Sequence, residues 1–181
     1  MNKFIKADLF RYTGLKNNFF KTFLFAPGYR FTWFLRKAKQ YENFIIINSF
    51  YRIIVRYYQL KYGFQISYRT EIGKGFYIGH YGTIVIADTA IIGDNCNINH
   101  GVTIGKTSRG KLKGSPVIGN NVWLGAHSTI VGKIIIGNNV LISPGAFVNF
   151  DVPSDSLVIG NPGKIKASKN ATNGYINRIL N

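Results

Sequence analysis

Three histidines, His80, His100 and His127, are the residues of this sequence best suited to proton transfer. The pKa of imidazole lies near neutrality, so a histidine can take a proton from a substrate hydroxyl as that oxygen attacks an acyl group. The single cysteine, Cys96, falls at a small-residue position of the repeat described below. We therefore expect the thiol to be inert packing rather than a nucleophile.

The spacing of the histidines predicts where they meet. His80 and His100 each come two residues after an isoleucine that recurs every six residues, and they are separated by one repeat of three hexads plus a two-residue slip at Ile84–Ile86. We therefore expect these two side chains to lie on one edge of the fold, one coil apart. His127 comes three residues after Leu124, which predicts a solvated turn residue on another edge.

Metal binding is the rival use of paired histidines. No other cysteine or carboxylate is placed to complete such a site, because Asp88 and Asp94 fall in turns at other phases of the repeat. The chain also has no glycine-rich phosphate loop of the nucleotide-binding types. We therefore expect proton transfer rather than metal chemistry.

A six-residue repeat positions these histidines. The residue after the aliphatic position is often glycine, and the residue four places after the aliphatic position is usually small or β-branched. This pattern predicts a left-handed parallel β-helix in which three hexads close one triangular coil and the aliphatic side chains stack inside. The repeated positions are Ile66, Ile72, Ile78, Ile84, Ile86, Ile92, Ile98, Ile104, Ile118, Leu124, Ile130, Ile136, Ile142 and Val148.

The rest of the chain divides around this repeat. Residues 1–64 hold 19 of the 27 aromatic residues, and helical spacing predicts helices over Arg30–Lys39 and Phe44–Lys61, with Asn43 as N-cap and Gly63 as C-cap. We expect a mainly β protein with a helical unit at 1–64, the β-helix at 65–163 and a tail at 164–181. A polar, basic loop, residues 106–116, interrupts the repeat.

The charge balance points to an anionic partner. The net charge is +16, and the basic residues gather in residues 1–64 and the loop instead of forming a stripe along the coil. That distribution argues against nucleic acid. It suits an anionic membrane surface bound through residues 1–64, although the aromatic residues there would also suit burial between subunits. We find no signal peptide or membrane-spanning segment, and expect a cytoplasmic protein, peripheral on the inner face of the cytoplasmic membrane.

The repeat resembles a known family of enzymes. The segments that carry the resemblance are YIGHYGTIVIADTAIIGDNCNINHGVTIG, PVIGNNVWLGAHSTIVGKIIIGNNVLISPGAFV and the closing LVIGNPGKI. Together they look like the hexapeptide-repeat acetyltransferases of the serine acetyltransferase type. Within these, the chain is more similar to the branch that O-acetylates bacterial capsule, exopolysaccharide or lipopolysaccharide sugars, such as the colanic-acid acetyltransferases. The resemblance covers roughly residues 64–166.

The resemblance implies roles for individual residues. His80 matches the catalytic base of the family. Gln65 stands where serine acetyltransferases have an aspartate that orients this base, Gly79 replaces an aspartate before it, and Ser115 replaces a second family histidine. These departures count against L-serine as the acceptor and leave His100 as the partner of His80.

The resemblance also implies acetyl-CoA as acyl donor and a homotrimer with active sites between neighbouring subunits. The positions expected to border acetyl-CoA are Gly105, Lys106, Ala126, Pro144, Asn149 and Lys164. We expect an acetyl-CoA-dependent O-acetyltransferase that acts on a sugar hydroxyl of a glycan precursor, with histidine as general base. The alternatives are a serine O-acetyltransferase of cysteine biosynthesis and a non-catalytic β-helix scaffold.

Overall fold

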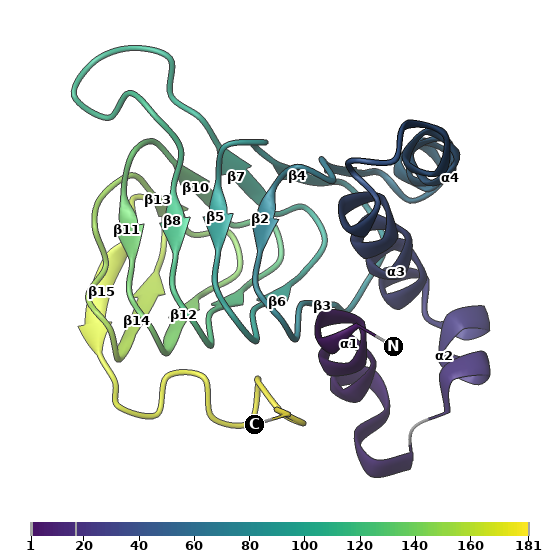
Figure 1. Cartoon of the computed structure of the whole chain (residues 1–181). Coiled ribbons are helices and arrows are strands. Elements are labelled where there is room, and N and C mark those ends of the chain that lie inside the picture. The colour runs from purple at the N-terminus through teal and green to yellow at the C-terminus, as the bar shows by residue number, and fades with distance from the viewer. Residues whose placement is uncertain (1, 17, 181) are drawn as a thin grey trace.

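The structure is a computed structural model that describes residues 2–16 and 18–180. Helices come first along the chain and strands follow (Figure 1). The helices are α1 (Lys3–Thr13), the 3-10 turn η1 (Gly14–Lys16), α2 (Phe19–Phe25), α3 (Pro27–Gln40) and α4 (Ile45–Tyr62).

Two of these helices match the sequence prediction. α3 begins at Pro27, a favoured first helical residue, and α4 ends at Gly63, whose φ of 77° gives a left-handed C-cap. The predicted N-cap of α4, Asn43, is wrong, because Phe44 takes that position and makes no side-chain cap. α1 and α2 also fall within the predicted helical unit of residues 1–64, but their bounds were not predicted.

The strands form three parallel sheets that wrap one coil. Sheet A contains β1 (Phe64–Ile66), β4 (Ile84–Ile86), β7 (Thr103–Gly105), β10 (Thr129–Val131) and β13 (Phe147–Val148). Sheet B contains β2 (Glu71–Ile72), β5 (Ile91–Ile92), β8 (Val117–Ile118) and β11 (Ile135–Ile136). Sheet C contains β3 (Tyr77–Ile78), β6 (Asn97–Ile98), β9 (Trp123–Leu124), β12 (Val140–Ile142), β14 (Ser156–Ile159) and the antiparallel β15 (Lys164–Ala167).

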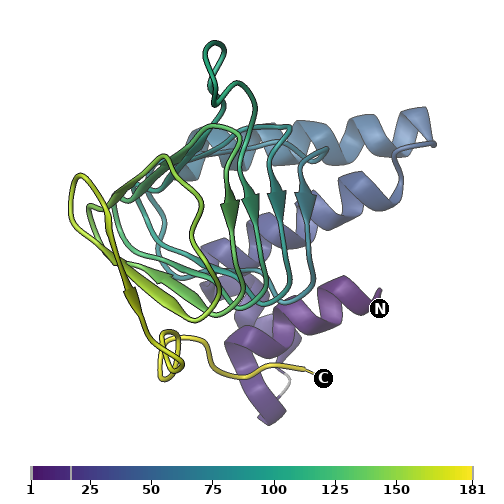
Figure 2. The same cartoon turned by 90° about the vertical axis from the view of Figure 1, so that its left-hand side faces the viewer.

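The chain visits sheets A, B and C in turn and advances one coil each time, in a left-handed sense (Figures 1 and 2). All fourteen predicted aliphatic positions are buried, and they stack in register, as Ile86 does on Ile104. The predicted left-handed parallel β-helix with an N-terminal helical unit is therefore confirmed. Its core is a column of aliphatic side chains that neighbouring coils share.

The helices lie at the first-coil end of the β-helix (Figures 1 and 2). A buried ion pair links α1 to α3, with Arg36 Nε donating to Asp8 Oδ2 over 2.9 Å, and the same carboxylate holds the coil by accepting from the backbone N–H of Phe76 over 2.9 Å. Burial raises the pKa of Asp8 despite the Arg36 charge. Arg11 of α1 also reaches the coil and donates to the carbonyl of Asn95 over 3.2 Å.

Candidate functional site

The three histidines lie in successive turns between sheet C and sheet A, which we call the histidine corner (residues 79–83, 99–102, 125–128 and 143–146). The ring centroids of His80 and His100 are 5.9 Å apart, and those of His100 and His127 are 5.1 Å apart, with edge-to-face geometry in both pairs. The structure therefore brings His80 and His100 together as predicted. The prediction that His127 lies on another edge is wrong.

The backbone of His127 explains why simple counting misplaced it. Its N–H donates to the carbonyl of His100 over 3.0 Å, and its φ is 59°, in the left-handed region. His127 comes three residues after Leu124, whereas His100 comes two residues after Ile98. The left-handed conformation turns the His127 side chain back to the same edge of the coil. The preceding histidine is followed by Gly101, where an added Cβ would lie 2.2 Å from His127 Nδ1. A glycine is therefore needed to let the two imidazoles meet.

The turn that carries His80 is longer than the turns below it. Ile78 and Ile86 are eight residues apart, whereas Ile98 and Ile104, at the same places one coil later, are six apart. Gly82, at φ 136°, lets this wider turn close over the neighbouring coil, because a Cβ there would lie 3.2 Å from His100 Cβ. The two-residue slip in the repeat is thus the insertion that holds His80 outward.

Gln65, which stands at the position of the family's orienting aspartate, takes no part in holding His80. It lies on β1 opposite Val85, and no hydrogen bond joins it to His80 among the residues described. No carboxylate in residues 2–16 and 18–180 pairs with any of the three histidines. His80 and His127 are exposed, and His100 is half-buried between them. Within the described chain, the immediate neighbour of the His80 imidazole is therefore another imidazole.

Two of the residues expected to border acetyl-CoA continue the histidine corner. Ala126 immediately precedes His127, and the N–H of Gly145 donates to the Ala126 carbonyl over 2.9 Å. Pro144 lies one coil further on, directly beneath Gly125, where an added Cβ would be 2.5 Å from the Pro144 nitrogen. The turns therefore form one continuous edge that runs from His80 to Pro144.

Three others lie along the opposite edge of sheet A. Gly105 ends β7, Lys106 opens the loop, and Asn149 follows β13. The loop folds back on itself through reciprocal backbone hydrogen bonds of 2.9 Å between Thr107 and Gly114, and it projects from the coil (Figure 1). Lys164 begins β15, on the terminal hairpin. Five of the six predicted positions thus flank sheet A, and Lys164 lies apart from them.

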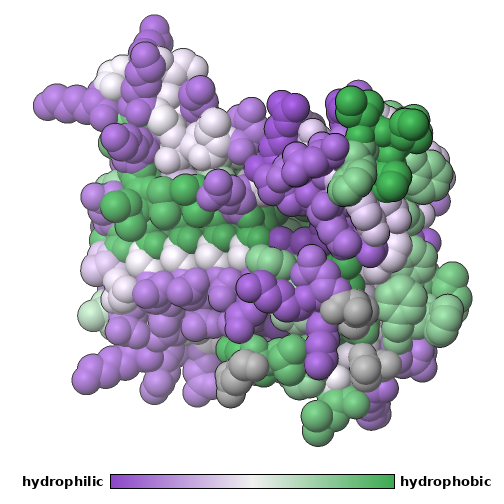
Figure 3. Space-filling model, viewed as in Figure 1, coloured by the Kyte–Doolittle hydropathy of each residue, from purple (hydrophilic) through white to green (hydrophobic). Residues whose placement is uncertain are grey.

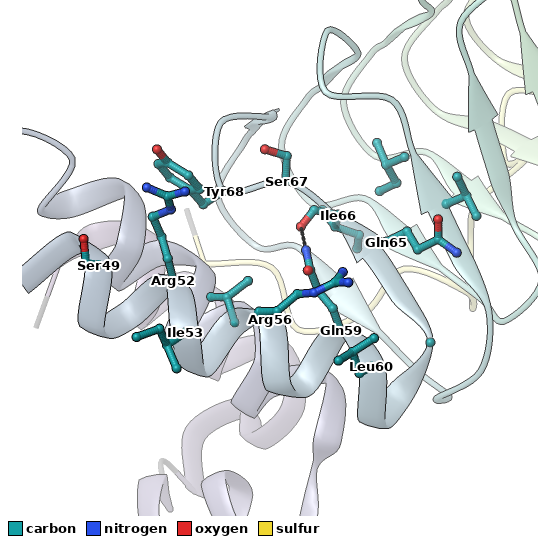
Figure 4. A pocket seen from close by; sticks show the side chains of 14 residues that line it. Ser49, Arg52, Ile53, Arg56, Gln59, Leu60, Gln65, Ile66, Ser67 and Tyr68 are labelled. Atoms are coloured by element: carbon teal, nitrogen blue, oxygen red, sulfur yellow. Dashed lines mark hydrogen bonds between the residues drawn. The ribbon is translucent and has the colours of Figure 1, made fainter.

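A groove between α4 and the first coil was not predicted. Its volume is about 1160 Å³, and its polar lining includes Arg52, Arg56, Gln65, Ser67 and Tyr68 (Figure 4). One end is near the histidine corner, because the lining residue Gly63 packs against the turn after His80. The spacing of Arg52 and Arg56, four residues apart on a helix, is a signal that could have revealed this basic wall.

The histidine corner lacks the ligands of a metal site among the described residues. Although three imidazoles are adjacent, the described residues contain no group of three His, Cys, Asp or Glu side chains that could hold a metal ion. Cys96 is buried, and burial raises its pKa to about 12, so the thiol stays protonated at neutral pH. The chemistry that the residues of the site support is proton transfer by exposed imidazoles beside an open sheet.

Comparison with known proteins supports an acetyltransferase origin for the coil. The family Bacterial transferase hexapeptide (six repeats) matches residues 115–149. The chain is 41% identical to a serine acetyltransferase of Synechococcus elongatus over 114 residues, which are 63% of this chain and 47% of that protein. The chain thus spans about half the length of this curated relative.

Solved structures give the same result. The serine acetyltransferase of Neisseria gonorrhoeae superimposes with a TM-score of 0.77 at 28% identity, over 92% of this chain and 64% of that one. The serine acetyltransferase of Brucella abortus in complex with coenzyme A has a TM-score of 0.76 at 25% identity, over 91% of this chain and 67% of that one.

These comparisons correct the sequence analysis on one point. The predicted closeness to polysaccharide acetyltransferases, and with it a sugar hydroxyl as acceptor, is wrong, because these relatives are serine acetyltransferases. The departures at Gln65, Gly79 and Ser115 therefore do not distinguish this chain from serine acetyltransferases. The findings favour the alternative, a serine O-acetyltransferase.

Proposed function

We propose that this protein transfers an acetyl group from acetyl-CoA to the hydroxyl group of serine. The observation that carries this proposal is the exposed His80 imidazole, held out by an enlarged turn at the edge of sheet A in a coil similar to those of serine acetyltransferases. A neutral imidazole at an accessible edge can serve as a general base. Proton transfer is the one step for which this site has a suitable side chain.

In the proposed reaction His80 accepts the proton of the serine hydroxyl as its oxygen attacks the thioester carbonyl. The new C–O bond forms, the C–S bond breaks, and the departing CoA sulfur takes the proton back from His80. His100 acts as a positioning residue, because its ring packs edge-to-face on His80 where no carboxylate is available. This arrangement supplies, with an imidazole, the orientation that the missing aspartate gives in the family.

The surroundings of sheet A fit acetyl-CoA as the donor. The histidine corner forms one edge, and the loop with Lys106, Arg109, Lys111 and Lys113 rises from the other. CoA carries several phosphate charges, which cationic side chains bind through charge-assisted hydrogen bonds. The pantetheine arm would lie over the sheet between these edges, with its thiol end toward the histidines.

The test is acetyl-CoA turnover with L-serine as acceptor, followed by thiol release. We expect His80→Ala to lower kcat by roughly 10²- to 10⁴-fold, which is the usual contribution of a general base, with an unchanged KM for acetyl-CoA. His100→Ala should lower kcat less. Equal melting temperatures for the variants and the parent protein serve as the folding control. Undiminished turnover by His80→Ala, or CoA binding without any turnover of serine, would refute the proposal.

We also propose that three copies assemble into a trimer through sheet B. Its outward row contains the exposed side chains Ile91, Val117 and Ile135, one from each of three adjacent coils. Figure 3 shows a hydrophobic band over the strands of sheet B. A continuous apolar strip of this kind is typical of a subunit contact. Light scattering should give three times the chain mass of 20.3 kDa, and a monomer would contradict the proposal.

A further inference from the structure

The outer side of α4 carries an apolar stripe that nothing in the described chain covers. Its members are Ile46, Phe50, Ile53, Tyr57 and Leu60, all exposed, with Ile46 at 85% and Ile53 at 70%. They follow one another at spacings of four and three residues, so they share one face of the helix. Figure 3 shows hydrophobic surface at the corresponding corner of the molecule, with hydrophilic surface beside it.

This stripe is not the face that holds α4 to the protein. The buried residues of the helix are Asn48, Val55 and Tyr62, which lie on the opposite side at 100° per residue. Asn48 anchors that side by donating to the carbonyl of Ala38 over 2.7 Å. α4 is therefore apolar on two opposite faces, and only one of them is used within the chain.

Cations flank the stripe, and none of them pairs with an acid in residues 2–16 and 18–180. Arg52 and Arg56 line the groove on one side of the stripe, as the sticks in Figure 4 show, and the spacing of the helix places Lys61 on the other side. Residues 1–64 contain twelve Lys and Arg but only two acids. Both acids are engaged within the chain, Asp8 with Arg36 and Glu42 with Lys39. The charge around the stripe is thus left for an external anion.

α2 adds a second exposed apolar group at the same end of the molecule. Phe20, Leu24 and Phe25 are exposed on this helix, and Lys21 lies among them. α3 packs between α2 and α4, so both apolar groups belong to one helical layer at the first-coil end (Figure 1). None of the described helices is long and apolar enough to cross a membrane.

We infer that this layer docks on an anionic lipid surface, with the α4 stripe and the α2 aromatic residues among the acyl chains and the cations among the headgroups. Apolar helices with basic flanks bind in this way, through buried apolar area and attraction to anionic lipids. A two-fold contact between the α4 stripes of two copies would meet the apolar requirement, but it would place the Arg52, Arg56 and Lys61 side chains of both copies together with no acidic residue of either α4 to offset them. The charge therefore selects lipid as the occupant.

The test is sedimentation of the full chain with vesicles. We expect binding to phosphatidylcholine vesicles that contain phosphatidylglycerol, weaker binding at high salt, and little binding to phosphatidylcholine alone. The double variant Ile46→Asp and Ile53→Asp should weaken binding by roughly tenfold or more. Its matched control is Ile159→Asp with Ile165→Asp, because these two exposed isoleucines lie at the far end of the coil.

The charge is tested separately. Arg52→Gln with Arg56→Gln should weaken binding to the anionic vesicles by roughly thirtyfold, whereas Lys133→Gln with Lys169→Gln, which removes the same charge elsewhere, should not. Binding that is equal in all variants, or absent from anionic vesicles, would overturn the inference. A lower solution mass of the Ile46 and Ile53 variant would also overturn it, because the stripe would then be a subunit interface. None of these measurements depends on acetyl transfer.

Discussion

The helical layer and the coil of this protein are stabilised in different ways. In the coil, the same contact recurs every turn, so that Ile78, Ile98 and Leu124 stack in one row and share one environment. In the helices, the attachment to the coil combines a shared apolar core with polar contacts that each differ from the next, such as the hydrogen bond from the Phe76 N–H to Asp8. Loss of one repeat contact leaves many others of the same kind, whereas each polar contact of the helices occurs once.

The two regions also divide the chemistry. The coil holds the histidines on a rigid edge where neighbouring turns fix their spacing. Residues 1–64 hold twelve basic and two acidic residues, which is +10 of the net charge of +16, and they hold most of the large exposed apolar side chains. The spacing of the histidines depends on the backbone geometry of the coil, whereas the charge and apolarity of the helical surface depend only on the residue types that it carries. Substitutions in one region can therefore change its property without changing that of the other.

The largest effect is expected when the buried ion pair of the helices, Asp8 with Arg36, is broken. Asp8→Ala leaves the Arg36 guanidinium, which is largely buried, without its carboxylate. Breaking one side of a buried ion pair costs about 3–5 kcal/mol. In a Trp33→Phe background, which leaves Trp123 on β9 as the fluorescent reporter of the coil, we expect a urea titration to reduce the helical circular dichroism before the Trp123 fluorescence changes.

The chain offers a matched control for that experiment. Glu42→Ala breaks the other ion pair of the helices, with Lys39, in which both side chains are more than 40% exposed. Exposed pairs contribute about 0–1 kcal/mol, so this variant should unfold like the parent protein. If the two variants lose equal stability, the distinction between anchored helices and a repetitive coil is wrong.

The regular contacts of the coil could be predicted from the sequence, whereas the irregular contacts of the helices could not. The coil was predictable because fourteen aliphatic residues keep one phase, and all fourteen are buried. The anchors of the helices were not, because Asp8 and Arg11 meet partners 64 to 86 residues away and follow no period. At the site, His80 and His100 were found from phase alone. His127 was missed because its left-handed φ shifts it by one place in the hexad.

A smaller effect is expected at the histidine corner. Gly101→Ala places a side chain at φ 74°, with its Cβ 2.2 Å from His127 Nδ1, so the imidazole must move. Gly110→Ala has the same φ of 74° but meets nothing within 4 Å. Both variants should lose about 1–2 kcal/mol to backbone strain, and the Gly101 variant should lose more. Equal melting temperatures for the two variants would show that the His127 imidazole is not tightly packed against Gly101.

The smallest effect is expected inside the coil, at Cys96. Burial raises the pKa of this thiol to about 12, and its Sγ contacts the Gly119 carbonyl at 3.2 Å. At pH 8 the folded protein therefore holds far less thiolate than an exposed cysteine would, and the thiolate is the form that reacts with iodoacetamide. We expect mass spectrometry to show slow alkylation of the native protein, rapid alkylation in urea, and no effect of the reagent on acetyl transfer.

The pH dependence of Cys96 has a definite sign. The folded state keeps the thiol proton to a higher pH than the unfolded chain does, so the stability due to the buried thiol is complete below the ordinary thiol pKa of about 8.5. It is lost as the pH rises toward 12. Cys96→Ala should therefore flatten the alkaline fall in unfolding free energy while changing little at pH 7. Rapid alkylation of the native protein at pH 8 would mean that the coil opens locally, and that its repeated contacts are less cooperative than the comparison with the helices implies.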